Sequence, residues 1–448
     1  MFRGLILLLF SSLVVNPTLA QSWLIQSDDD ARKVLAAVQD GDQVNVKAGR
    51  YAGPWNIHSA IQLVADEGAI LDGQGLQHGV VIHKANTQLS GLRIENWGKS
   101  LGDLHAGVFV QKTAANTQLK NLSLQGTSFG IWVDATQGVL IEGCIIEGDL
   151  NTRSQDRGNG IHLFNVTQGR VINNEVWHTR DGIYIDTSNH NELSGNYLHD
   201  LRYGVHYMYS HYNTVHYNKT ERTRTGYALM QSHHLDVQFN ESQHDTNYGV
   251  LMNFITYSKI KNNRVVNAKQ GQNVAGELID GAEGKALFIY NSVYNEISGN
   301  QLKDSDLAIH VTAGSEGNQI FGNAFINNRN QVKYVSNRKQ EWSHEGQGNY
   351  WSDYLGWDMN NDGLGDTLYQ PNDGIDQLLW KFPNARILFN SPGIILMRWV
   401  EEQFPVLKKP GVTDSYPLIA DPSLLKQATP QTQQVHNNEP EQVTYYGG

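Results

Sequence analysis

A repeat of about 22 residues constrains the fold of this chain more than any other sequence feature. Asparagines recur at steps of 22, 22, 22, 23, 37 and 23 residues, with an aliphatic residue three positions before each. The repeating asparagines are Asn174, Asn196, Asn218, Asn240, Asn263, Asn300 and Asn323. A fixed period of this length is typical of solenoids, in which one short unit stacks on the next.

Each repeat reads as short strands separated by turns. In stretches such as 182–185 and 204–207 successive side chains are expected to point to opposite faces of a strand. These stretches lie between Asn-, Gly- and Ser-rich turns. They are too short for helices and have a period of two. A unit of this size cannot bury its apolar face alone, so we expect coils stacked at about 4.8 Å, with each strand paired in parallel to its copies. The predicted fold is all-β, a single-stranded right-handed parallel β-helix with a buried asparagine ladder. Cys144 takes the ladder position of an earlier coil, where we expect a small buried residue.

The repeat also predicts the organisation of the chain. We expect coils over residues 40–335, interrupted by an insertion of about fifteen residues near 268–284. Residues 21–39 are a predicted N-terminal cap, and their second half has the apolar spacing of an amphipathic helix. Residues 336–420 form a predicted C-terminal extension. Residues 421–448 are rich in Gln, Asn and Pro and are predicted to be disordered.

The N-terminal sequence indicates where the protein is located, and its net charge limits the kinds of partner it can bind. Arg3, an apolar run and the small residues before Gln21 predict a signal peptide over residues 1–20, cleaved after Ala20. No later stretch reaches the roughly 18 apolar residues of a membrane span. The net charge is -11 without a basic run, which argues against a nucleic-acid partner. With Cys144 as the single cysteine, no internal disulfide can form. A periplasmic protein is therefore expected.

Two outward columns are predicted when the residue after each coil glycine is taken as inward. The first column is His162, Tyr184, His206, Ala228 and Leu251, and the second is Phe164, Asp186, Met208, Met230 and Asn253. The least certain register is at the last coil, where Met252 is the alternative outward residue.

Soft metal ligands gather on these columns. Met208 and Met230 should stack one strand spacing apart, near His206 and near His211 and His233 of the following turn. Thioether and imidazole ligands suit Cu(I), which predicts a transient copper site. The alternative is that the methionines pack under a loop or form a partner-contact patch.

A second metal pattern follows the coils. The spacing of oxygen donors matches the first part of an EF-hand-type loop and predicts structural Ca²⁺. The donors are Asp358, Asn360, Asp362, the carbonyl of Leu364 and Asp366. Tyr369 stands where the closing Glu would be, so the alternative is a polar turn without metal.

The segment 390–407 has a helix start at Ser391 and Pro392. Apolar residues on this segment are candidates for docking a membrane partner, and the alternative is that the helix caps the solenoid. The docking candidates are Ile394, Met397, Trp399, Val400 and Phe404.

A carbohydrate-active enzyme is the main alternative function. Parallel β-helices often cleave or epimerise acidic polysaccharides, which requires clustered carboxylates with calcium and an Arg or His base. The outward columns hold Asp186 as the main carboxylate, and the net acidity disfavours a polyanionic substrate. We therefore expect a protein that is not an enzyme.

Four segments resemble the NosD family of nitrous oxide reductase maturation proteins. They are RYGVHYMYSHYN (202–213), GNYWSDYLGWDMNNDGLGDTLY (348–369), NDGIDQLLWKFP (372–383) and NSPGIILMRWVEEQFPVL (390–407). The resemblance implies a periplasmic, non-catalytic subunit of an ABC-type complex in the inner membrane. Its implied partners are the ATPase and permease pair, a copper chaperone lipoprotein and nitrous oxide reductase itself. The resemblance does not supply the copper ligands, so a metal-free docking scaffold stays open as a second alternative.

Overall fold

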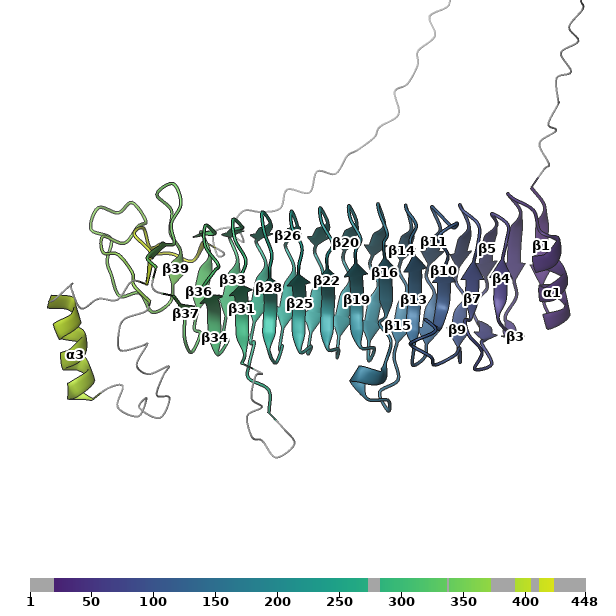
Figure 1. The fold of residues 1–448 in the computed structure, drawn as a ribbon, viewed down its shortest axis with the longest axis horizontal. Coiled ribbons are helices and arrows are strands. Elements are labelled where there is room, and N and C mark those ends of the chain that lie inside the picture. Colours follow the sequence, from purple (N-terminus) through teal and green to yellow (C-terminus); the bar gives the residue numbers. More distant parts are fainter. Residues whose placement is uncertain (1–19, 273–282, 337, 372–390, 404–410, 423–448) are drawn as a thin grey trace, which may run out of the picture.

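The structure is a computed structural model that describes residues 20–272, 283–336, 338–371, 391–403 and 411–422. The predicted signal peptide, apart from Ala20, and the predicted tail from residue 423 onward lie outside the described residues. The described strands stack into one elongated solenoid, with α1 (Asp28–Ala37) at one end and α3 (Pro392–Gln403) beyond the other (Figure 1).

Three long sheets run along the solenoid, and their neighbouring strands pair in parallel. Sheet A contains, in order, β1 (Ser22–Ile25), β2 (Gln43–Val46), β5 (Gln62–Ala65), β8 (Gln88–Ser90), β11 (Gln118–Lys120), β14 (Leu140–Glu142), β17 (Arg170–Ile172), β20 (Glu192–Ser194), β23 (Thr214–His216), β26 (Asp236–Gln238), β29 (Lys259–Lys261), β32 (Glu296–Ser298) and β35 (Gln319–Phe321). Sheet B contains β3 (Gly49–Ala52), β6 (Ala69–Asp72), β9 (Arg93–Glu95), β12 (Ser123–Gln125), β15 (Ile145–Glu147), β18 (Glu175–Trp177), β21 (Tyr197–His199), β24 (Lys219–Glu221), β27 (Glu241–Gln243), β30 (Arg264–Val266), β33 (Gln301–Lys303), β36 (Ala324–Ile326) and β39 (Tyr350–Trp351). Sheet C contains β4 (Trp55–Ile57), β7 (Val80–Ile82), β10 (Ala106–Val110), β13 (Phe129–Asp134), β16 (Ile161–Phe164), β19 (Asp181–Asp186), β22 (Tyr203–Met208), β25 (Thr225–Met230), β28 (Tyr248–Asn253), β31 (Lys285–Tyr290), β34 (Leu307–Thr312) and β37 (Val332–Val335). The predicted parallel β-helix is confirmed.

The sheets extend further than the repeat indicated. Strands run from β1 to β39, whereas the predicted coils covered residues 40–335. The first strand is separated from the second by α1, and β39 follows an irregular segment that contains β38 (Gln340–Glu341). Such insertions break the sequence period without breaking the stack, because pairing depends on strand position and not on the length of the connecting turn.

The asparagine ladder forms the inner edge of one turn. The side-chain amide nitrogen of each asparagine donates to the side-chain oxygen of the next. Examples are Asn196 Nδ2 to Asn218 Oδ1 at 2.8 Å and Asn218 Nδ2 to Asn240 Oδ1 at 3.0 Å. The ladder continues over the 37-residue step, where Asn263 Nδ2 lies 3.0 Å from Asn300 Oδ1. Buried amides must be hydrogen-bonded to be tolerated, and the ladder satisfies them coil by coil.

Cys144 occupies the ladder as expected. Its side chain is fully buried, and its backbone N–H donates to Asn174 Oδ1 at 2.9 Å. Burial raises the pKa of the Cys144 thiol to about 12. A thiol held protonated in this way is neither a nucleophile nor a ready metal ligand.

Both ends of the solenoid are covered. Ser27 caps α1 by accepting from Asp30 N at 3.2 Å, and Ala31 and Val34 of this helix are buried. At the other end the indole rings of Trp342 and Trp351 lie almost parallel and are buried.

The C-terminal end is also closed by a buried carboxylate. Asp414 accepts from Trp351 Nε1 at 2.8 Å and from Asn349 N at 2.7 Å, next to β40 (Val412–Thr413), which pairs with β38. These aromatic and polar contacts cover the C-terminal end of the core. None of the residues that make them belongs to α3.

Candidate functional site

Sheet C carries the predicted columns in the predicted register, but most of the first column is buried. Met208 pairs with Met230 across β22 and β25, and His206 pairs with Ala228. Val205 and Tyr207 between them are fully buried and point inward. The alternation of inward and outward residues explains this arrangement, because strand side chains have a period of two.

Both methionines of the column are half-buried and lie on neighbouring strands. Met252, the uncertain residue of the next coil, is fully buried in the core, and Asn253 takes the outward position beside Met230. On the described part of sheet C, Met208 and Met230 are therefore outward neighbours, and Met252 does not add a third outward thioether.

His206 is more enclosed than an exposed copper ligand should be, which corrects part of the prediction. Only 7% of its surface is exposed. Its ring stacks on Tyr184 with centroids 4.2 Å apart, and Tyr203 packs edge-on at 5.1 Å. Aromatic neighbours one coil away and on the same strand cover the imidazole, which a single-strand alternation cannot foresee.

A buried carboxylate orients the His206 ring. Asp181 Oδ2 lies 3.0 Å from His206 Nδ1, and the same carboxylate receives two hydrogen bonds from Arg202, at 2.8 and 2.6 Å. Burial acts to raise the pKa of Asp181, but the hydrogen bonds from His206 and Arg202 outweigh it and hold the pKa below its ordinary value.

The second ring nitrogen of His206, Nε2, is the atom available to ligate a metal ion. His206 Nε2 is buried and makes no hydrogen bond to any residue in the described ranges. In the tautomer that donates Nδ1–H to the carboxylate, the lone pair resides on Nε2, which is the usual arrangement of a metal-ligating histidine.

His211 and His233 lie in the turn that follows and are arranged differently. Their rings stack in parallel with centroids 3.7 Å apart. His211 Nδ1 accepts from His233 N at 3.2 Å, and His233 Nδ1 lies 2.8 Å from His234 Nδ1. Burial first, and the neighbouring imidazoles second, lower the pKa of both His211 and His233, which favours neutral rings. Parallel rings direct their in-plane lone pairs side by side, so the stack is a poor chelate for one metal ion.

The structure does not support the calcium prediction. In the turn at 358–366 the side-chain oxygens accept from backbone N–H groups of the same turn. Asp358 Oδ2 accepts from Gly363 N at 2.8 Å, and Asp362 Oδ1 accepts from Leu364 N at 2.8 Å. Asp366 Oδ2 likewise accepts from Met359 N at 2.6 Å. The oxygens of Asn360 and its neighbours thus hold the turn itself, which is the polar-turn alternative.

The docking candidates on α3 are only partly exposed. Met397 has 50% of its surface exposed, Val400 is half-buried and Ile394 is buried at 8%. Ile394 therefore cannot belong to an exposed docking surface. The side chain of Trp399 and the whole of Phe404 lie outside the described residues.

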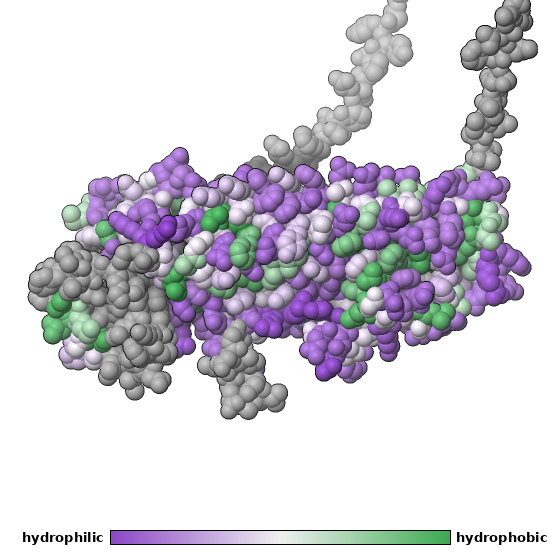
Figure 2. Space-filling view, viewed as in Figure 1, coloured by the Kyte–Doolittle hydropathy of each residue, from purple (hydrophilic) through white to green (hydrophobic). Residues whose placement is uncertain are grey.

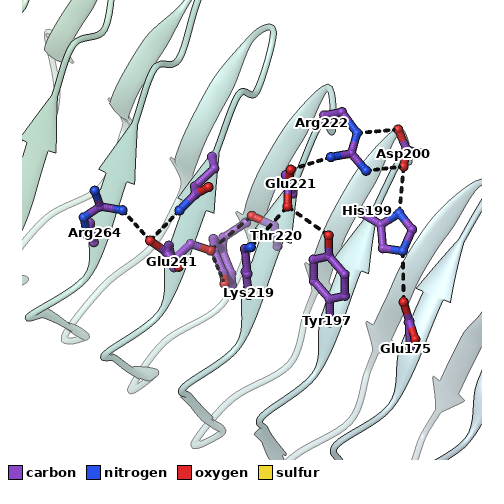
Figure 3. A network of polar contacts seen from close by, with 12 residues as sticks. Glu175, Tyr197, His199, Asp200, Lys219, Thr220, Glu221, Arg222, Glu241 and Arg264 are labelled. Atoms are coloured by element: carbon purple, nitrogen blue, oxygen red, sulfur yellow. Dashed lines mark hydrogen bonds and ion pairs between the residues drawn. The ribbon is translucent and has the colours of Figure 1, made fainter.

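Sheet B presents a different outer face, dominated by ion pairs (Figure 3). Arg222 bonds both Asp200, at 2.8 and 2.9 Å, and Glu221. The hydrogen bond from Arg222, despite burial, lowers the pKa of Asp200 to about 2. His199 Nδ1 approaches Asp200 at 2.7 Å, so these side chains are committed to one another.

Sequence reasoning missed Asp181 and the arginines that begin the strands of sheet C. The signal was present, because Arg180, Arg202 and Arg224 keep the same 22-residue step as the asparagines. In the described parts of the chain no three His, Cys, Asp or Glu side chains gather as a metal site.

Comparison with known proteins gives the family. A family model described as "Periplasmic copper-binding protein (NosD)" matches residues 142–356. A protein of Pseudomonas aeruginosa named "Probable ABC transporter binding protein NosD" is 54% identical over 385 residues, which are 86% of this chain and 90% of that protein. The chain belongs to the NosD family. A NosD relative from Stutzerimonas stutzeri with the same name is 48% identical over 92% of this chain and 95% of its own length. This NosD-family chain is accordingly a periplasmic protein. Within the described ranges none of its helices has the length and apolarity to cross a membrane.

Solved structures share the fold of this NosD-family protein at low sequence identity. The Dettilon tailspike protein superposes with a TM-score of 0.53 at 14% identity, over 69% of this chain and 64% of the tailspike. The A-module of the Azotobacter vinelandii mannuronan C-5 epimerase AlgE6 gives 0.52 at 13% identity, over 70% and 92%. A Yersinia enterocolitica family 28 exopolygalacturonase gives 0.51 at 13%, over 72% and 77%. At such identities the likeness extends to the β-helix alone.

Proposed function

We propose that this protein holds Cu(I) transiently on sheet C, at Met208, Met230 and the Nε2 atom of His206, and passes it on for assembly of nitrous oxide reductase. The observation that carries the proposal is the pairing of two thioethers in register beside an imidazole whose free nitrogen lacks a partner among the described residues. Soft sulfur and imidazole ligands of this kind favour Cu(I) over hard cations.

The order of the ligands suggests how the ion is received. The two half-buried thioethers are the accessible part of the site, and His206 lies deeper on the same face. His206 and Met208 are two residues apart on β22, so both side chains leave the strand in the same direction. Thioethers carry no proton to release, so the ion can enter and leave these two ligands by ligand exchange.

His211 and His233 have a lesser role in this proposal. Their stacked rings lie in the following turn, where the His211 ring already accepts from the His233 backbone and the His233 ring bonds His234. They fit an entry point that presents neutral imidazoles near the thioethers, and not the holding site.

In this view the chain is a non-catalytic periplasmic subunit. The names of its relatives, which are ABC transporter binding proteins, and the family description as copper-binding support such a role. We infer an ABC-type ATPase and permease pair as the membrane partner, a copper chaperone lipoprotein as the donor and nitrous oxide reductase as the recipient.

A carbohydrate-active role has less support from the site. Asp181, the buried carboxylate on sheet C, is occupied by Arg202 and His206, and Asp186 bonds Thr187 Oγ1 at 2.9 Å. Activity of the protein on alginate or pectate would revive this alternative.

An anaerobic Cu(I) titration against a chromophoric chelator tests the copper site directly. The test variant is Met208→Leu with Met230→Leu, which conserves volume while removing both sulfur atoms. Loss of an outer-sphere partner typically weakens metal binding about 10–100-fold, so loss of two direct ligands should weaken it by about 100-fold or more. Met252→Leu, which changes a fully buried methionine one coil away, should bind as the natural protein does.

Two results would count against the proposal. Natural protein without Cu(I) affinity tighter than micromolar would remove the site. A deletion strain complemented with a variant lacking all five candidate ligands, yet producing nitrous oxide reductase with full copper content, would leave a metal-free scaffold as the function. The five substitutions are His206→Gln, Met208→Leu, His211→Ala, Met230→Leu and His233→Ala.

A further inference from the structure

Arginines form a column where the strands of sheet C begin. Arg180, Arg202 and Arg224 directly precede Asp181, Tyr203 and Thr225, which pair in register across β19, β22 and β25. The backbone confirms the stack, because Arg202 N donates to the carbonyl oxygen of Arg180 at 3.0 Å. The three residues therefore repeat at about one strand spacing, roughly 4.8 Å.

Like charges this close repel unless each is compensated. Arg202 is compensated by Asp181 through two hydrogen bonds. Arg180 forms no ion pair with any residue in the described ranges, and its Nε atom is buried without a hydrogen-bond partner there. A buried guanidinium nitrogen in this state is an unused donor.

Arg180 also lines a cavity of about 530 Å³. The cavity is lined by Ser154, Gln155, Arg157, Thr179, Arg180, Asp200, Leu201, Arg202 and Arg224. Four of these residues are arginines and one is a carboxylate, Asp200, which already bonds Arg222 and His199. The lining is therefore cationic, although the chain as a whole carries a net charge of -11.

One wall of the cavity is held in place before any ligand arrives. It includes η1 (Ser154–Asp156), which protrudes from the side of the solenoid in Figure 1 and is hydrophilic in Figure 2. Arg157 fastens this loop by donating to the carbonyl oxygens of Thr152, Leu150 and His178 at 2.6, 3.0 and 2.9 Å. A pre-formed cleft with a few convergent polar groups is the usual form of a small-molecule site.

The geometry points to a binding site for a phosphate-bearing ligand in this cavity, with Arg180 as its principal contact. Guanidinium groups present planar pairs of N–H donors that match phosphate oxygens, and the hydroxyl of Ser154 and the amide of Gln155 at the rim add neutral donors. A cavity of about 530 Å³ is larger than a lone carboxylate needs. The phosphate could be that of a free anion or that of a lipid headgroup. This inference is independent of the copper role.

Calorimetric titration of the mature full-length chain with sodium pyrophosphate at low salt tests the inference. The natural protein should bind, and Arg180→Gln should weaken binding about tenfold or more, because a charge-assisted hydrogen bond contributes about that factor. The matched control is Arg170→Gln, which removes an exposed arginine that pairs with Glu192 on sheet A. Circular dichroism should show both variants folded.

Sedimentation with vesicles separates the two sources of phosphate. Binding to phosphatidylglycerol vesicles but not to phosphatidylcholine vesicles, lost in Arg180→Gln and without heat from pyrophosphate, supports the site and assigns it to a headgroup. The inference is overturned if neither probe binds, if Arg170→Gln weakens binding as much as Arg180→Gln, or if citrate binds as tightly as pyrophosphate.

Discussion

The two ends of the same three strands of sheet C carry opposite chemistry. β19, β22 and β25 are each six residues long, about 20 Å. They begin beside the arginine-lined cavity and end at Asp186, Met208 and Met230. Cationic donors thus gather at one end, and two soft thioethers lie beside the carboxylate of Asp186 at the other.

The difference shows what stacking does to each kind of side chain. A coil repeats its neighbour, so one favourable residue becomes a column. Thioethers stack without an electrostatic cost, whereas stacked guanidiniums repel and need a carboxylate or an anion between them. Asp181 serves both ends at once, because it compensates Arg202 and orients His206.

The largest expected effect on stability comes from removing Asp181, which bonds both Arg202 and His206. Asp181→Ala leaves Arg202 unpaired and His206 unoriented, so the free energy of unfolding should fall by about 3–5 kcal/mol. Chemical denaturation measures the change. Asp186→Ala, at the methionine end of the same strand, is the control and should cost about 1 kcal/mol or less. Equal losses in both variants would show that Asp181 has no special role.

The pH dependence sharpens this test. The pKa of Asp181 in the folded protein lies below its ordinary value, so its stabilising contribution is complete above the unfolded-state pKa. That contribution is lost as the pH falls through the folded-state value. The stability difference between the natural protein and Asp181→Ala should therefore narrow in acid.

An intermediate effect should distinguish the two kinds of imidazole near the methionines. His206→Gln should weaken Cu(I) binding about 10–100-fold, because it removes the oriented Nε2 ligand. The pair His211→Ala and His233→Ala should change equilibrium affinity little, since their rings stack on each other. Chelator competition gives the affinities, and the reverse ranking would move the holding site into the turn.

The smallest effect is expected from the exposed ion pair beside the arginine cavity. Arg222 and Asp200 lie 2.8 Å apart with 47% and 33% of their side chains exposed. Arg222→Gln should lower the free energy of unfolding by less than about 1 kcal/mol, because solvent screens such pairs. If Arg222→Gln lowered the free energy of unfolding as much as Asp181→Ala does, burial would not be what makes the Asp181 ion pair more stabilising than the Arg222 ion pair.

Much of the fold and part of the site followed from local patterns. The step between Asn196 and Asn218 predicted the ladder, and the same step predicted that Met208 lies beside Met230. The sequence left two outcomes open for the Asp358 turn, since the spacing of its oxygens fits both a calcium loop and a turn closed by its own N–H groups, and the hydrogen bonds follow the second pattern. The turn lies outside the coil repeat, so no period in the sequence selects one of these outcomes.

The sequence by itself determined the parallel β-helix, its register and the columns on its surface, because a fixed period and an inward–outward alternation leave one way to stack the coils. Only the tertiary structure decided that His206 is enclosed, that Asp181 joins it to Arg202, and that Arg180 borders a cavity walled by η1. These features depend on side-chain directions and on loop positions between different coils. Such contacts leave no period in the sequence.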